Sequence, residues 1–260
     1  MHSIVKRIVR GVKRRFTPET PTIPDTPEQR KLKMAKIVSA VKAPVPSERE
    51  LKMVEIIVLK YKDPEVETKC AVDVINHTDW PYKLVFYDNR PGAKNFSKVW
   101  NKLIKESTCD YVLVMDSDAF VPKLDPCWLT RMMQTFETHP DCWVVIPKVN
   151  RTSCEQQRAV VAEEKPPTIL TEPFAAQCVL YKKTVFEKVG FYDEDFLFYG
   201  QDSEWSLRAM RKGFNTYIRH DVLIDHGKHS SIGKAAKKGE FDRTLESEYA
   251  QKLFEEKTRA

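Results

Sequence analysis

Two carboxylates two residues apart, Asp116 and Asp118, are the residues of this chain whose type and spacing most clearly predict chemistry. They follow the apolar run 111–115, which is typical of a buried strand. Ligands of open α/β sheets bind outside the carboxyl ends of such strands. Carboxylate oxygens suit Mg²⁺ or Mn²⁺, and proteins often share such an ion with the phosphates of a substrate. The pair therefore predicts metal-assisted binding of a diphosphate, with a loop start or a helix cap as the alternative.

The elements that must position these carboxylates alternate between strand and helix. Apolar runs predict strands, and stretches of helical periodicity lie between them. The predicted strands are 54–59, 84–87, 111–115 and 143–146, and the predicted helices begin near Pro64 and cover 96–106 and 126–138. This order indicates an α/β nucleotide-binding sheet. The chain has only eight glycines and neither a G-x-G-x-x-G motif nor a P-loop, so a metal held by carboxylates would replace a glycine-rich phosphate cradle.

Length and composition predict one catalytic domain with tails. A chain of 260 residues with 42% hydrophobic content can bury one sizeable core. No apolar run approaches the roughly 18 residues needed to span a bilayer, and the start lacks the apolar core of a secretory signal. The six cysteines form no C-x-x-C pair, which favours a reducing cytoplasm over a disulfide framework or a zinc site. In that compartment the N-x-S/T triplets at Asn76, Asn95 and Asn150 are chance occurrences.

The N-terminal 50 residues read as a tail of two parts. Residues 1–16 carry six basic side chains, no acidic one, and apolar residues at helical spacing, whereas residues 17–260 are formally neutral. A basic amphipathic helix of this kind suits an anionic membrane surface, so we expect a cytoplasmic protein with a peripheral membrane contact through residues 1–16. A solvated tail, a targeting peptide and a nucleic-acid arm are the alternatives. A proline-rich stretch, 17–26, would tether this segment.

The second half adds a predicted strand, 174–181, and then a recognisable motif. The run Gly190-Phe191-Tyr192-Asp193-Glu194 continues through Phe196-Leu197-Phe198-Tyr199-Gly200-Gln201-Asp202-Ser203-Glu204. Together with the Asp116–Asp118 pair, it resembles the acceptor-side signature of family 2 glycosyltransferases, and the resemblance covers about Val54 to Ser231. It implies a GT-A fold: a Rossmann-like mixed sheet flanked by helices. We expect this domain over 51–232 and a charged C-terminal helix over 233–260.

The resemblance also implies a reaction and its residues. A sugar moves from a nucleoside diphosphate donor to an acceptor hydroxyl, with inversion at the anomeric carbon. Asp202 is the expected general base, because a hydroxyl needs help to lose its proton at neutral pH. Asp118 and His226 are the expected metal ligands, and the imidazole favours Mn²⁺ over Mg²⁺. The expected contacts of the nucleotide sugar are Tyr61, Asp88, Asn95, Asp116 and Asp118.

Each of these residues could instead have a purely structural role. Asp202 opens an amphipathic helix with Leu207, Met210 and Phe214 on one face, so it could be the helix cap, with Glu204 as the base. His226 could be an ordinary surface or hydrogen-bonded histidine. The remaining Asp residues could end strands as turn residues.

The tryptophans could lie in the core or contact a sugar. Trp100, Trp128 and Trp143 are expected in the core, whereas Trp205 could be buried or stack on a sugar.

The sequence departs from the family pattern on the donor side. Gln201 replaces the acidic residue before the base, Lys62 replaces a small polar residue, and the stretch 88–95 is short. In that stretch, Arg90 and Lys94 are candidates for contact with the diphosphate.

The region 150–172 lacks periodicity and is a candidate acceptor-binding or lid loop.

Two other function classes compete with the transferase. A nucleotidyltransferase would also need a sheet-end carboxylate and a metal, but only Lys60 and Lys62 hint at the basic loop that it requires. A non-catalytic scaffold that binds a nucleotide sugar or a membrane is the third reading. The sequence leaves open the donor sugar, the nucleobase, the acceptor and the oligomeric state, because loop shapes decide them.

Overall fold

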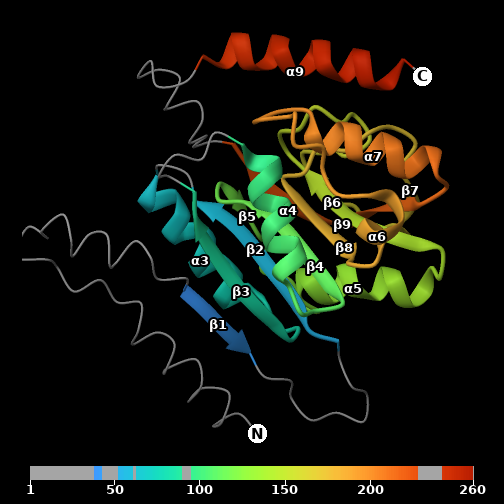
Figure 1. Ribbon diagram of the computed structural model, residues 1–260. Coiled ribbons are helices and arrows are strands. Elements are labelled where there is room, and N and C mark those ends of the chain that lie inside the picture. Colours follow the sequence, from blue (N-terminus) through green and yellow to red (C-terminus); the bar gives the residue numbers. More distant parts are fainter. Residues whose placement is uncertain (1–37, 43–51, 61–62, 90–94, 228–241, 260) are drawn as a thin grey trace, which may run out of the picture.

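The computed structural model describes residues 38–42, 52–60, 63–89, 95–227 and 242–259. These residues form a mixed sheet with helices on both faces and one further helix outside (Figure 1). The strands are β1 (Val38–Lys42), β2 (Val54–Lys60), β3 (Tyr82–Asp88), β4 (Tyr111–Asp116), β5 (Ala119–Phe120), β6 (Cys142–Val149), β7 (Thr168–Ile169), β8 (Cys178–Lys182) and β9 (Asn215–His226). The helices are α3 (Pro64–His77), α4 (Phe96–Glu106), α5 (Trp128–Thr138), α6 (Val185–Val189), α7 (Gln201–Arg211) and α9 (Arg243–Thr258).

The sheet order is β1-β3-β2-β4-β8-β6-β9-β5, with β7 paired to β9. β2 lies between β3 and β4 and runs parallel to both, so the carboxyl ends of these three strands share one edge. In this register Leu59 lies opposite Asp116, and Lys60 lies opposite Asp88. β8 runs antiparallel to β4 and β6, which makes the sheet mixed. The α/β architecture expected from the sequence is therefore confirmed.

Successive residues of β2 point into two separate cores, as expected for a strand buried on both faces. Ile56 belongs to a core formed with α3 and α5, including Val74 and Trp128. Ile57 belongs to a core formed with α4, α6 and α7, including Trp205. The sheet therefore lies between two helical layers, and its carboxyl edge carries the candidate site.

Side chains begin several of these helices. Asp63 precedes Pro64 and accepts a hydrogen bond from the backbone N–H of Val66 at 3.4 Å, so α3 has both an N-cap and a proline at its first position. Asn95 caps α4 by accepting from the N–H of Lys98 at 2.8 Å. The α4 boundaries agree with the predicted helix 96–106.

Other boundaries differ from the sequence predictions. The helix expected over 126–138 begins at Trp128, because Cys127 is its N-cap. The strand expected over 174–181 begins only at Cys178, after residues that border the candidate site. Val38–Lys42, assigned to the N-terminal tail from sequence, forms the edge strand β1, antiparallel to β3. The basic segment 1–16 lies outside the described residues.

Helix α9 corresponds to the predicted C-terminal helix and lies outside the sheet and its flanking helices (Figure 1). Near its end, the carbonyl oxygen of Thr258 accepts a hydrogen bond from Nη2 of Arg211 in α7 at 2.9 Å. Asp242 caps it, and Ala250 is only 6% exposed on its inner side. Lys257 forms ion pairs with Asp193 and, at 2.6 Å, with Asp195. Leu245 and Tyr249 of this helix are exposed, whereas Leu253 and Phe254 are half-buried. No helix among the described residues is long and apolar enough to span a bilayer.

Candidate active site

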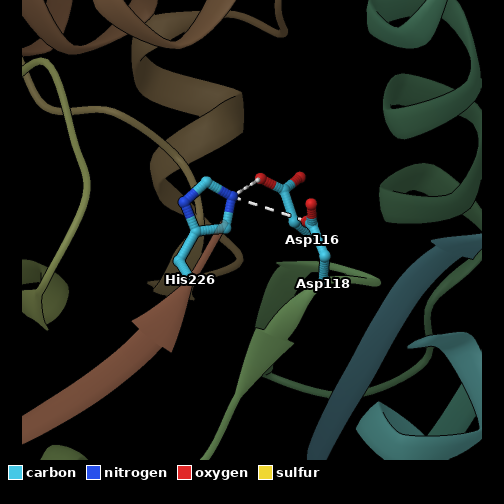
Figure 2. A group of neighbouring side chains, drawn as sticks. All are labelled: Asp116, Asp118 and His226. Carbon is cyan, nitrogen blue, oxygen red and sulfur yellow. Dashed lines mark ion pairs between the residues drawn. The ribbon is translucent and has the colours of Figure 1, made fainter. Parts of the chain in front are cut away.

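Asp116, Asp118 and His226 meet at the carboxyl edge of the sheet (Figure 2). Asp116 ends β4, Asp118 precedes β5, and His226 ends β9. The short strand β5 pairs with β9, with Ala119 opposite His226, and this pairing brings the histidine to the two carboxylates. The Nε2 atom of His226 lies 3.5 Å from Oδ2 of Asp116 and 3.4 Å from Oδ1 of Asp118.

The electrostatics of this cluster reflect two carboxylates close to one imidazole. Burial raises the pKa of Asp116 to about 6, and the negative charges of Asp118 and Asp202 also raise it. The hydrogen bond and the positive charge of His226 lower this pKa and so oppose the rise. Burial alone would lower the pKa of His226, but the hydrogen bonds and charges of Asp116 and Asp118 raise it to about 10. A proton on His226 and a divalent cation are therefore alternative ways to balance the two carboxylates.

These three side chains fit a divalent metal ion. Each offers one ligand atom, and the three atoms all lie within 4.8 Å of one another. The Nδ1 atom of His226 lies 3.0 Å from the carbonyl oxygen of Arg151, which can only accept a hydrogen bond. The Nδ1 atom therefore carries a proton, and Nε2 faces the carboxylates as a ligand would. Two carboxylate oxygens and one imidazole nitrogen suit Mn²⁺ better than Mg²⁺.

The cluster opens into a cavity of about 640 Å³, a volume ordinary for a small-molecule site. The cavity wall combines the Asp116–Asp118–His226 cluster with residues from the run 190–204. Among the latter are Phe198, Tyr199, Gly200, Gln201, Asp202 and Ser203, and other parts of the chain contribute Phe96, Trp100, Arg151, Gln177 and Ser247. Aromatic rings and carboxylates thus face one space.

Asp202 lies in this cavity near the start of α7. Its Oδ2 atom accepts a hydrogen bond from the backbone N–H of Ala176 at 2.7 Å, and its Oδ1 atom accepts from the N–H of Ser203 at 2.9 Å. Burial raises the pKa of Asp202, while these N–H groups oppose the rise. The N-cap position belongs to Gly200, which has φ 85°, so the alternative role of Asp202 as the cap is wrong.

Glu204, the alternative base, forms an ion pair with Arg208 outside the cavity. Its two carboxylate oxygens accept from Nε and Nη2 of Arg208, both at 2.8 Å. Arg208 also donates to the carbonyl oxygens of Val189 and Phe191. Glu204 does not line the cavity, so its contacts are those of a structural ion pair.

Trp205 faces away from the cavity. It is fully buried, and its indole N–H donates to the carbonyl oxygen of Gly190 at 2.7 Å. The buried face of α7 contains Trp205 and Ala209, whereas Leu207 and Met210, the face expected from sequence, are only half-buried. Trp205 is therefore a core residue and no sugar platform.

The tryptophans expected in the core differ in their burial. Trp128 is fully buried, Trp100 is buried but also borders the cavity, and Trp143 is half-buried.

The expected donor-side residues are not all brought together. Asp88 ends β3 and does not line the cavity. Asn95 caps α4 and donates to the carbonyl oxygen of Glu194 at 2.6 Å, so its amide joins the acceptor-side signature to that helix. Tyr61, Arg90 and Lys94 lie outside the described residues.

Several residues of the cavity wall received no individual role from the sequence, among them Arg151, Gln177 and Ser247. Arg151 follows β6 and lies at the start of the region 150–172, which was expected to bind the acceptor or form a lid. Gln177 precedes β8, within a stretch that read as strand. Ser247 comes from α9, and no sequence signal connects it with the site.

The sheet order, with helices on both faces and a cavity at the carboxyl edge, defines an α/β protein with a GT-A fold. The family model for glycosyl transferase family 2 matches residues 69–223, and the chain belongs to this family. Among solved structures, the chain is similar to one described as "Crystal structure of GalNAc-T7 with UDP, GalNAc and Mn2+". That likeness has a TM-score of 0.52 at 10% identity, and it covers 69% of this chain but only 44% of the other. A comparison with curated protein sequences finds no similar one.

Proposed function

We propose that this protein is a metal-dependent glycosyltransferase that moves a sugar from a nucleoside diphosphate donor to an acceptor hydroxyl, with inversion. The observation that carries the proposal is one cavity lined by both the Asp116–Asp118–His226 cluster and Asp202. A divalent ion bound by this cluster would stabilise the charge that develops on the leaving diphosphate. The related fold of a protein solved with UDP and Mn²⁺ supports Mn²⁺ as this ion and a nucleotide sugar as the donor.

In the proposed reaction, Asp202 accepts the proton of the acceptor hydroxyl. The hydroxyl oxygen forms a bond to the anomeric carbon as the bond from that carbon to the phosphate oxygen breaks. The nucleoside diphosphate leaves on the opposite side of the sugar, which inverts the anomeric centre. The N–H groups of Ala176 and Ser203 fix the Asp202 carboxylate in place for this step.

The pH dependence should reflect the environment of Asp202. The base must be ionised, and burial raises its pKa, so activity should rise as pH increases through that raised pKa. At saturating Mn²⁺, where protons no longer compete for the metal-binding cluster, kcat/KM should show an acidic limb above pH about 4. An activity that stays constant with pH down to about 4 would contradict this role of Asp202.

Arg151 should contact the leaving diphosphate. Among the described residues, it is the only lysine or arginine that lines the cavity, and its Nη1 atom donates to the carbonyl oxygen of Gly227 at 3.1 Å. Arg151→Gln should weaken binding of the preferred nucleoside diphosphate by about tenfold, because a charge-assisted hydrogen bond is lost. The affinity for the matching nucleoside should stay unchanged. Lys165→Gln, which removes an exposed charge from the same loop, is the control, and calorimetry in Mn²⁺ is the measurement.

The described residues do not provide the basic loop that a nucleotidyltransferase would require. Of the two lysines that hinted at a basic loop, Lys60 forms an ion pair with Glu67 at 3.6 Å, and Lys62 lies outside the described residues.

Three further predictions from the sequence stay proposals. They are a catalytic domain over 51–232, a cytoplasmic location and a membrane contact through residues 1–16. Vesicle binding by the intact chain would test the membrane contact.

A further inference from the structure

The end of strand β9 is held by the two residues that follow β6, Asn150 and Arg151. The Asn150 side-chain oxygen accepts from the backbone N–H of His226 at 2.8 Å, and its amide nitrogen donates to Oδ1 of Asp225 at 2.5 Å. The carbonyl oxygen of Arg151 faces Nδ1 of His226 at 3.0 Å, and its guanidinium donates to the carbonyl oxygen of Gly227 at 3.1 Å. Two consecutive residues thus contact three consecutive residues around the histidine of the metal-binding cluster.

The sheet itself does not provide this support from β6. The β6–β9 pairing shifts register after Pro147 and ends where Val149 lies opposite Ile224. Asp225 and His226 extend beyond that point and pair only with the two-residue strand β5. The side chain of Asn150 replaces the missing backbone hydrogen bonds with one contact to the His226 backbone and one to Asp225.

We propose that Asn150 is a positioning residue for the metal site, a role that rests on the proposed metal-dependent function. It fixes the backbone of His226, and the Arg151 carbonyl then fixes the imidazole ring so that Nε2 faces Asp116 and Asp118. Residues that hydrogen-bond to a metal ligand, without contacting the metal, typically contribute about 10- to 100-fold to metal affinity. Asn150 contacts none of the three ligand atoms, so its effect must act through His226.

The same two residues connect the metal site to the loop 150–172. Thr152 and Ser153 follow directly and line the cavity, and the loop returns to β6 through the hydrogen bond from the Ala159 N–H to the Val149 carbonyl oxygen. An ion that immobilises His226 should therefore also immobilise the start of this loop. Mn²⁺ binding would then order part of the cavity wall, as well as hold a diphosphate.

The test is a titration of the intact protein with Mn²⁺ alone, in which electron paramagnetic resonance measures the concentration of free Mn²⁺. Asn150→Ala should weaken Mn²⁺ binding at least about tenfold. The double swap Asn150→Asp with Asp225→Asn should restore near-native affinity, because it exchanges the amide and the carboxylate and keeps the acceptor for the His226 N–H. The matched control is Asn215→Ala, which removes an amide bonded to Asp141 at 2.7 Å at the other end of β9 and should leave Mn²⁺ affinity unchanged.

Hydrogen exchange gives a second measurement. Mn²⁺ should slow amide exchange over 150–159 in the native protein and in the double swap, but not in Asn150→Ala. Native Mn²⁺ affinity in Asn150→Ala would overturn the positioning role, as would equal losses in Asn150→Ala and the double swap. If Asp118→Ala also binds Mn²⁺ normally, the proposed metal site itself fails, and this outcome differs from a failure confined to Asn150.

Discussion

Asp202→Asn is expected to lower kcat by at least about 10²-fold, because the amide cannot accept the proton of the acceptor hydroxyl. The amide is nearly isosteric with the carboxylate, and its oxygen can still accept from the N–H of Ala176 or Ser203. The fold and the Asp116–Asp118–His226 cluster should therefore persist. Affinity for the nucleoside diphosphate in Mn²⁺ should stay within about twofold of native, since the lost interaction acts in the transition state. Rapid-quench measurement of sugar transfer, with calorimetry of nucleotide binding, checks both parts.

Glu204→Gln is the matched control for this change. It removes a carboxylate two residues away that pairs with Arg208 and does not line the cavity. It should lower the melting temperature, because it weakens a partly buried ion pair, but leave kcat per folded molecule nearly native. Near-native turnover by Asp202→Asn, or loss of turnover by Glu204→Gln in folded protein, would refute the assignment of the base.

Asp118→Ala is expected to abolish Mn²⁺ binding at micromolar concentrations and, with it, the Mn²⁺-dependent part of nucleotide affinity. The change removes one of three ligands and leaves only Asp116 and His226 near the ion. Turnover should fall by at least about 10²-fold, because the charge on the leaving diphosphate loses its stabilisation. Electron paramagnetic resonance of free Mn²⁺ and release of nucleoside diphosphate measure the two effects.

Asp73→Ala is the control for the loss of an acidic side chain. Asp73 lies on α3 and pairs with the exposed Lys69 at 2.5 Å, away from the cavity. This variant should bind Mn²⁺ and nucleotide as the native protein does. Retained Mn²⁺ binding in Asp118→Ala would exclude Asp118 as a ligand and return it to the role of a turn residue.

Much of the sheet edge could be predicted from sequence because each strand carries its own signal. The apolar run before Asp116 identified β4, and the alternation of strands and helices indicated an α/β sheet. The pairing of β4 with β2 came only from the structure. Strand β1 was missed because its residues, VSAVK, are too few and too mixed to stand out from the segment around them. An edge strand of this kind is determined by its pairing with β3, which is not a local property.

The position of His226 beside the carboxylates depended on family resemblance, because the contact that creates it is not local. The two-residue strand β5 is too short to produce a periodic pattern, yet its pairing with β9 brings the histidine to Asp116 and Asp118. Asn150 appeared in the sequence only in a chance N-x-T triplet at a loop start. Its role became visible once the end of β9 was known to extend beyond its pairing with β6.

The roles of polar residues were the least predictable part of the site. Asn95 was expected to contact the nucleotide sugar, but the structure shows its amide capping α4 and contacting Glu194. Ser247 reaches the cavity because α9 packs against the acceptor-side signature, and no property of an isolated serine reports such a contact. The sequence identifies residue types that can do chemistry, whereas tertiary packing decides which of them share a cavity.

The most direct test of a metal-dependent transferase is calorimetric titration of the intact protein with UDP, GDP, dTDP and CDP, with and without Mn²⁺. Binding of one nucleoside diphosphate that requires Mn²⁺ is the predicted result, and it would also identify the donor class. Folded protein that binds none of the four, or that binds one equally well without Mn²⁺, would contradict the proposal.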